Sequence, residues 1–217
     1  MKLLKVFTVL SRLANLQRFS MERLSHPESV LEHTGFVSLI AAILASEIDH
    51  IDVGAVVFKA LIHDLDEVVV GDVARPTKYS SLEAKRMFDD LAVRGVTRVA
   101  SDFYEDFPDF SGRLVDDYQC AKVGHDGLIV AIADVLAVVH TVWGEVIVRN
   151  NHAMLRQAFT AGDQIDKLRA RVAEEFSGSD ADFLNSVLDD ARDLMITAQE
   201  CDDPIYATMM EEPGRAN

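Results

Sequence analysis

The sequence predicts an all-α fold, and two observations lead to that prediction. Apolar residues recur at helical spacing along most of the chain, and no segment shows the alternation of apolar and polar residues that is typical of a half-buried strand. With 217 residues, of which 49% are hydrophobic, the chain is long enough to bury one sizeable core. We therefore expect one helical domain over residues 1–200, followed by a C-terminal tail over residues 201–217.

The first expected helix covers residues 3–17 and is amphipathic. Its expected apolar face consists of Leu3, Val6, Phe7, Leu10, Leu13 and Ala14. A loop should follow at residues 25–29, because Pro27 disfavours helix in the residue before it and Ser29 can cap the next helix. The apolar N-terminus is similar to a signal peptide for a few residues, but Arg12 interrupts it and no small-residue cleavage site follows.

The second expected helix covers about residues 30–48 and carries a histidine on its apolar stripe. The expected stripe consists of Phe36, Ile40, Ile43, Leu44 and Ile48. One helical turn towards the N-terminus this stripe reaches His33, so the imidazole of His33 should point into the protein. Taken alone, a histidine in such a position is more often a core residue bonded to a backbone carbonyl than a metal ligand.

The helical segment expected over residues 53–70 carries a carboxylate where its apolar stripe should continue. Positions 53, 56, 57, 60 and 61 are apolar, and the next position on that stripe is Asp64. A buried carboxylate without a partner costs several kcal/mol, so Asp64 should lie beside a cation, a hydrogen-bond cluster or a metal ion. The neighbouring residue His63 can reach the same ion.

The segment after this helix is less regular. Residues 71–79 are rich in glycine and proline and are expected to form an ordered loop. A helix should then start after Ser80 or Ser81 and end at Gly95. Residues 96–119 are acidic and aromatic without a clear period, which predicts an irregular connection packed by its own aromatic residues; a lid or a partner surface is the alternative.

From Gly127 the chain is apolar on all sides except at Asp134, which predicts a central buried helix. The apolar run Leu128–Val139 contains a carboxylate and is too short to cross a bilayer, so we expect no membrane span. Two further amphipathic helices are expected over residues 151–176 and 180–200, with their acidic side chains in solvent.

Composition limits the partners of the chain. The formal charge is -15, with 36 acidic against 21 basic residues, which argues against a partner that is a nucleic acid polymer or an anionic membrane. A small phosphorylated ligand in a locally positive pocket remains compatible with this charge. The two cysteines, Cys120 and Cys201, are far apart in sequence, which favours a reducing, cytoplasmic location over a disulfide framework.

The buried polar positions can be explained by one metal ion. Four polar residues are expected on inward faces: His33, His63, Asp64 and Asp134. The free-energy cost of burying each side chain is offset by the others only if the four converge. The simplest common partner is one divalent transition metal ion, such as Co²⁺, Mn²⁺, Fe²⁺, Ni²⁺ or Zn²⁺, with room left for water or a phosphate oxygen. Such an ion supplies a nucleophile from water near neutral pH and neutralises charge on phosphate.

The order of these four residues resembles the H…HD…D signature of the HD-domain phosphohydrolase superfamily. Further segments are similar to the YfbR-type 5'-deoxynucleotidases: Leu-Ser-Arg-Leu at 10–13, Gln-Arg-Phe-Ser-Met at 17–21, Glu32-His33, Glu67 after His63-Asp64, and Gly71-Asp72 with Pro76, Lys78 and Tyr79. The resemblance covers roughly residues 8–150. It implies an HD-domain helical bundle that assembles as a dimer or larger homo-oligomer and removes phosphate from 2'-deoxynucleoside 5'-monophosphates.

The resemblance also implies roles for single residues. Glu67 would be the acid or base near the attacking water, Asp72 would orient the phosphate or the water, and Arg18 would bind phosphate or help to select the sugar. Beside these roles, we infer that Lys78 and Arg75, the cations of the loop that follows, can offset phosphate charge. The structural alternative is that Glu67 and Asp72 are solvated charges around a loop and that Arg18 is a surface cation.

One departure from the family concerns substrate selection. Phe19 stands where those nucleotidases have tryptophan, so an indole is replaced by a smaller ring without an N–H donor. A related group of phage HD proteins hydrolyses dATP to deoxyadenosine and triphosphate, so a dNTP triphosphohydrolase is the second candidate and a nucleotide phosphodiesterase the third. A helical sensor or scaffold that binds metal or nucleotide without turnover is the candidate from another class.

Overall fold

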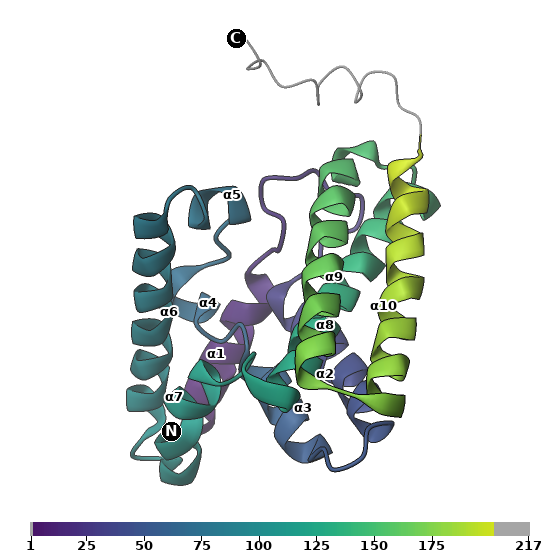
Figure 1. Ribbon diagram of the computed structural model, residues 1–217. Coiled ribbons are helices and arrows are strands. Elements are labelled where there is room, and N and C mark those ends of the chain that lie inside the picture. The colour runs from purple at the N-terminus through teal and green to yellow at the C-terminus, as the bar shows by residue number, and fades with distance from the viewer. Residues whose placement is uncertain (1, 202–217) are drawn as a thin grey trace.

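The computed structural model describes residues 2–201, which fold into helices (Figure 1). The elements are α1 Lys2–Asn15, α2 Val30–Ser46, α3 Val53–Ile62, α4 Glu67–Val70, α5 Arg75–Lys78, α6 Leu82–Phe103, α7 Pro108–Gln119, α8 Gly124–Trp143, the π-helical turn η1 Gly144–Val148, the 3-10 turn η2 His152–Met154, α9 Leu155–Glu175 and α10 Gly178–Gln199. Within residues 2–201 the extended pairing is limited to an isolated bridge between Gln17 and Ser29, so the all-α prediction is confirmed. Apart from Cys201, the expected tail lies outside the described residues.

The predicted central helix is confirmed in α8. Leu128, Ile129 and Ile132 are fully buried, and α2, α3, α9 and α10 pack around this helix. Figure 1 shows α9 and α10 on one side of the molecule and α6 on the other. A second apolar cluster joins α6 and α7 to α1, and it includes Ile62 and Leu65. Because Ala60 belongs to the first cluster, the turn after α3 lies where the two clusters meet.

The central helix is longer than its apolar run suggests. Residues Gly124–Val148 form a continuous helical stretch of 25 residues, and an 18-residue window within it has a mean hydropathy of 1.9. By length and composition this stretch could cross a membrane. The expectation that the apolar segment of this helix is too short to cross a membrane is therefore wrong. The core helix of a soluble protein has the same length and composition, and 56% of this window is buried inside the protein.

Helix α6 does not end at Gly95, as we expected, but continues to Phe103. Gly95 is buried against α4: a Cβ atom there would lie 3.3 Å from the carbonyl oxygen of Asp66 and 3.4 Å from the Cβ of Val69. The glycine therefore permits close packing of two helices instead of ending one.

The expectation of an irregular connection over residues 96–119 is also wrong, because most of this stretch is helical in α6 and α7. Pro108 occupies the first turn of α7, where a missing N–H costs nothing. The aromatic residues pack on one another as expected: the ring of Phe103 lies 5.8 Å from that of Phe107 and 5.9 Å from that of Phe110.

Two further differences between the predicted and the observed helices concern the segments around the site. The segment 53–70 is not one helix, because α3 ends at Ile62 and α4 starts at Glu67 after a turn. The expected loop at 71–79 contains the four-residue helix α5. The turn between α3 and α4 holds His63 and Asp64, so both side chains project from a helix end.

The buried faces of α1 and α2 differ from the predicted stripes. Helix α2 buries Val37, Ala41 and Leu44 together with His33, whereas Phe36 and Ile43 are exposed by 42% and 56%. On α1 the exposed large side chains are Leu3, Leu4, Phe7 and Leu10, and Leu13 faces the core. Each of these helices has apolar residues on a buried face and on an exposed face. The periodicity of the sequence alone does not show which of the two faces is buried.

Candidate metal centre

The proposed ligand residues are positioned by three different helices. Helix α2 begins with a capping box, in which the side chain of Ser29 accepts from the N–H of Glu32 and the Glu32 carboxylate accepts from the N–H of Ser29. This cap fixes the first turn, where His33 is completely buried. The turn after α3 carries the His63-Asp64 pair, and the middle of α8 carries Asp134.

The four side chains converge on one point. The Nε2 atom of His33 lies 3.0 Å from Oδ1 of Asp134 and 3.8 Å from Oδ2 of Asp64. The Nε2 atom of His63 lies 3.1 Å from the same Asp64 oxygen and 3.9 Å from Oδ1 of Asp134. One donor atom each from His33, His63 and Asp64 lies within 4.8 Å of the others.

The surroundings of His63 fit a cation. Its Nδ1–H donates to the carbonyl oxygen of Ala60 at 2.7 Å, which leaves the lone pair of a neutral imidazole on Nε2. Nε2 is buried and has no hydrogen-bond partner among the described residues, although a carboxylate oxygen of Asp64 lies 3.1 Å away. Two acceptors that face each other in a buried site are stabilised by a shared cation, so these residues fit a metal ion.

Both aspartates are held in the anionic form. Burial alone would raise the pKa of Asp64, but the positive charge beside it, from His63 when that ring is protonated and from Lys122, outweighs burial and holds the pKa well below its usual value. For Asp134, burial is again outweighed, first by the charge of Lys122 and then by the hydrogen bond with His33, so its pKa is also well below the ordinary value. Ionised carboxylates are the form that a metal ion requires.

Lys122 is a site residue that the sequence did not indicate. Its Nζ atom lies 2.5 Å from Oδ2 of Asp134, the carboxylate oxygen that does not contact His33. Gly127 allows this approach, because a Cβ atom there would collide with the main chain of Lys122. A lysine in the short connection between two helices carries no periodic signal, so only the structure reveals the pairing.

Glu67 and Asp72 lie beside the ligand cluster. Burial, followed by the charges of Asp64 and Asp72, raises the pKa of Glu67 to about 10. Its Oε2 atom is buried without a hydrogen-bond partner among the described residues. Burial is also the first reason that the pKa of Asp72 is raised. The alternative of solvated charges around a loop is contradicted for Glu67 by its buried oxygen.

Arg18 and Phe19 reach the cluster from the connection between α1 and α2. The Nη1 atom of Arg18 contacts Nδ1 of His33, and its guanidinium carbon lies 5.2 Å from the centre of the Phe19 ring. The N–H of Phe19 donates to Oδ2 of Asp72 at 3.1 Å, and Phe19 adopts a positive φ of 52°. These contacts join three of the predicted residues to one another and to His33, a proposed ligand.

Lys78 is not brought to the cluster. Its Nζ atom lies 3.6 Å from Oδ1 of Asp89 on α6, and its side chain is partly exposed. Its role in binding substrate stays a prediction.

Two buried carboxylates near the site were also missed by the sequence. Glu28 lies with Oε1 3.6 Å from Nδ1 of His33, and its Oε2 accepts from the hydroxyl of Thr141 at 2.8 Å. Burial opposes ionisation of Glu28, but His33 and Arg18 outweigh it, so its pKa is lowered. Glu145 accepts from the N–H groups of Ser25 and His26 at 2.7 and 2.9 Å and so ties the α1–α2 connection to η1.

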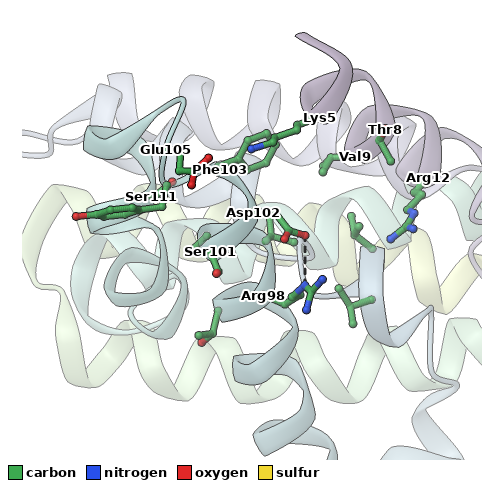
Figure 2. A pocket seen from close by; sticks show the side chains of 16 residues that line it. Lys5, Thr8, Val9, Arg12, Arg98, Ser101, Asp102, Phe103, Glu105 and Ser111 are labelled. Carbon is green, nitrogen blue, oxygen red and sulfur yellow. Dashed lines mark hydrogen bonds and ion pairs between the residues drawn. The ribbon is translucent and has the colours of Figure 1, made fainter. Parts of the chain in front are cut away.

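Another hollow is lined by none of the predicted site residues. It has a volume of about 960 Å³ and is lined by α1, α4, α6 and neighbouring residues (Figure 2). Its lysine and one of its arginines are already paired, Lys5 with Asp106 at 3.0 Å and Arg98 with Asp102 at 3.3 Å. Among the described residues, the group able to hold a metal ion is the one around His63 and not one in this hollow.

The all-α frame and the donor set of two histidines and two aspartates define the class of HD-domain phosphohydrolases. Within that class, residues 5–184 match the model of the family described as 5'-deoxynucleotidase YfbR-like. The chain therefore belongs to the YfbR-like 5'-deoxynucleotidase family, and the resemblance noted in the sequence is confirmed.

Individual relatives agree with this placement. The chain is 26% identical over 175 residues to the 5'-deoxynucleotidase Ent638_2835 of Enterobacter sp. (strain 638), which covers 78% of this chain and 84% of the relative. The fold is similar to that of an HD-domain phosphohydrolase (lin2634) from Listeria innocua, with a TM-score of 0.71 and 22% identity over 96% and 97% of the two chains. It is also similar to the cyanophage S-2L HD phosphohydrolase DatZ bound to dA and one catalytic Zn²⁺ ion, with a TM-score of 0.57 and 15% identity over 85% and 95%.

Proposed function

We propose that this protein is a metal-dependent 5'-deoxynucleotidase that converts a deoxynucleoside 5'-monophosphate and water into a deoxynucleoside and orthophosphate. The observation that carries the proposal is the convergence of His33, His63, Asp64 and Asp134 beside the buried Glu67. Family membership over residues 5–184 supports the substrate class.

His33, His63, Asp64 and Asp134 would together hold one divalent transition metal ion, with Co²⁺, Mn²⁺, Fe²⁺, Ni²⁺ and Zn²⁺ as the candidates. The catalytic Zn²⁺ of the cyanophage neighbour favours a metal of this group. When bound, the ion supplies Lewis acidity toward phosphate and water.

Glu67 would move the proton of the attacking water or of the leaving group. Because burial and the charges of Asp64 and Asp72 raise its pKa to about 10, Glu67 holds a proton at neutral pH. A cation among those carboxylates favours the ionised form and lowers this pKa, which brings the group toward the range in which it can both accept and donate a proton.

Arg18, Asp72 and Phe19 would place the substrate. An arginine guanidinium can bind two phosphate oxygens at once, and Arg18 already lies against the ligand His33. Asp72 would orient the phosphate or the water, and by accepting from the N–H of Phe19 it also holds the backbone of that residue. Lys78 would add long-range positive charge for the phosphate.

A dNTP triphosphohydrolase is the second candidate. The observation that keeps it as a candidate is the structural similarity to a phage HD phosphohydrolase bound to dA, because dA is the nucleoside product of either reaction. The same ligand set serves both reactions, and only the contacts to the base and to the additional phosphates would differ. A sensor or scaffold without turnover is disfavoured by the buried Glu67, which a binding site alone does not require.

Product analysis by ion-exchange chromatography separates these candidates. The purified protein is incubated with Co²⁺ or Mn²⁺ and with separate dNMPs, NMPs and dNTPs. Orthophosphate released from dNMPs is the expected result. Tripolyphosphate released from a dNTP would replace the proposal with the second candidate, and nucleotide binding without any product would favour the sensor.

We also propose that the protein forms a homodimer or larger homo-oligomer through an exposed apolar surface. The candidates for this surface are the exposed apolar side chains Leu3, Leu4, Phe7 and Leu10 of α1, Phe36, Leu39 and Ile43 of α2, and Leu61 of α3. Of these, Leu10 and Leu61 also line an apolar hollow of about 440 Å³. Exposed apolar surface on this scale is typical of an interface. Light scattering of the Phe7→Glu variant should give a smaller assembly than the wild type.

The proposed location is the cytoplasm. Cys120 and Cys201 are both free thiols, and Cys120 is exposed. Free thiols are most stable in a reducing compartment, which is also where nucleotide substrates are found.

A further inference from the structure

Two cationic side chains within residues 2–201 contact the proposed metal ligands. Arg18 contacts His33, and the ammonium group of Lys122 contacts Asp134. Lys78, the lysine that the sequence predicts to offset phosphate charge, forms its ion pair with a carboxylate of α6 instead. Of these two lysines, Lys122 is therefore the one that lies beside the proposed ligands.

The ammonium group of Lys122 and the two histidines contact different oxygens of Asp134. Oδ1 lies 3.0 Å from Nε2 of His33 and 3.9 Å from Nε2 of His63, whereas Oδ2 lies 2.5 Å from Nζ of Lys122. Because both oxygens belong to one carboxylate, a metal ion at Oδ1 and the ammonium group at Oδ2 would be neighbours without competing for one atom. A phosphate bound to that ion would lie close to the ammonium group.

The main chain of Lys122 is held in place by two helices. A Cβ atom at Gly127 of α8 would lie 2.4 Å from the carbonyl carbon of Lys122 and 2.9 Å from its Cα, so a larger residue would displace the connection. The carbonyl oxygen of Lys122 also accepts from Nη2 of Arg171 on α9 at 3.5 Å. These contacts fix the point from which the side chain reaches Asp134.

The ammonium group has hydrogen-bond donors left for a ligand. A lysine ammonium group carries three N–H donors, and in the part of the chain that the structure describes its acceptor is Asp134. The side chain of Lys122 is 41% exposed, so the remaining donors can be reached from solvent. A charged donor beside a metal centre is well suited to a phosphate oxygen, because hydrogen bonds between two charged groups are the strong ones.

We propose that Lys122 is a substrate-binding residue, whose ammonium group stays bonded to Asp134 and donates a further hydrogen bond to a phosphate oxygen of the substrate. The inference rests on the proposed function and adds a residue to its phosphate site. Arg18 lies in the α1–α2 connection and Lys122 in the α7–α8 connection, so cations from two separate segments would share the charge of the phosphate.

Phosphate binding without turnover tests the proposal. Inorganic phosphate is titrated into each protein by calorimetry, at a Co²⁺ concentration that saturates that protein. Lys122→Gln can still donate to Asp134 but has no charge, so phosphate binding should weaken by about 10- to 100-fold, as expected for the loss of a charged hydrogen bond. Lys122→Arg keeps both the charge and the donors and should stay within about fivefold of the wild type.

Lys85→Gln is the matched control. Lys85 is similarly exposed and also bonds to an aspartate, but it lies on α6, so this variant should bind phosphate within about twofold of the wild type. Circular dichroism checks that each variant is folded, and visible absorption gives its Co²⁺ affinity. A side chain that only orients Asp134 would change the Co²⁺ affinity and leave the phosphate affinity of the metal-loaded protein unchanged.

The outcomes separate this proposal from the proposed function. Lys122→Gln that binds phosphate as tightly as Lys85→Gln would overturn the role of Lys122 and leave the proposed function standing if the wild type hydrolyses dNMPs. A metal-loaded wild type that binds no phosphate would also overturn that role. Phosphate binding that depends on Lys122 as expected, in a protein that hydrolyses no dNMP, would overturn only the proposed function.

Discussion

The proposed metal ligands and the proposed reaction residues lie in two different kinds of structure. His33 and Asp134 project from long helices that pack in the main core, and the His63-Asp64 pair follows directly on a third core helix. Arg18, Phe19, Glu67 and Asp72 belong to a connection, a four-residue helix and a loop. The four proposed ligands, which we call the metal half of the site, are attached to core helices. The four proposed reaction residues, which we call the reaction half, are held by polar contacts between short segments. Changes in the second half should therefore alter catalysis and leave metal binding intact.

The largest expected effect is at a proposed ligand. Asp64→Ala removes a carboxylate that lies within 4 Å of both histidines, so both metal binding and turnover should be lost. Because the ion would stabilise the transition state by several kcal/mol, we expect the rate to fall by about a thousandfold or more. Co²⁺ titration and the initial rate of dNMP hydrolysis measure the two effects. Turnover by a metal-free Asp64→Ala protein would disprove the ligand assignment.

Glu67→Gln should impair catalysis and leave metal binding nearly unchanged. The amide has nearly the same shape but cannot transfer the proton, so we expect kcat to fall by about 10² to 10⁴. Co²⁺ affinity should remain within about threefold of the wild type, because Glu67 is not among the proposed ligands. A parallel loss of both quantities would mean that Glu67 contributes to metal binding and that the division into two halves is wrong.

The same division explains what the sequence could predict. The sequence could place His33 and Asp134 on inward faces, because a polar residue on the inward face of a helix interrupts a periodic apolar pattern. Glu67 and Asp72 were found only through the family resemblance. Lys122 was missed because a lysine between two helices does not show which carboxylate it meets. Gly95 was misjudged because the reason for a glycine was packing against α4, a contact with residues far away in sequence.

Glu145 provides a test of how the reaction half is held. The carboxylate is buried and accepts from Ser25, His26 and Asn151, which anchors the connection that carries Arg18. Glu145→Ala leaves these donors without a partner, so the free energy of unfolding should fall by about 2 to 3 kcal/mol at pH 7. Urea denaturation measures this loss, and Glu174→Ala on the exposed side of α9 is the control with the same change of charge.

The contribution of Glu145 should also depend on pH. Its hydrogen bonds outweigh burial and lower its pKa in the folded protein below the ordinary value of 4.5. A group with a lowered folded pKa stabilises the protein above its unfolded pKa, and this stabilisation is lost as the pH falls through the folded value. The difference between wild type and Glu145→Ala should therefore be largest near neutral pH and shrink below about pH 4. A difference that grows on acidification would contradict the assigned direction.

The smallest expected effect concerns Lys78, the predicted substrate residue that the structure places away from the cluster. Lys78 and Lys85 both pair with Asp89, at 3.6 and 2.5 Å, and both are partly exposed. If Lys78 attracts the phosphate, Lys78→Met should raise KM by about two- to fivefold without changing kcat, in the range expected for a solvent-screened charge. Lys85→Met removes the same charge from the same carboxylate and should leave KM unchanged. Equal effects of the two variants on KM would show that Lys78 acts only through the general charge of this surface, and the effect of Lys78→Met should decrease as salt is added.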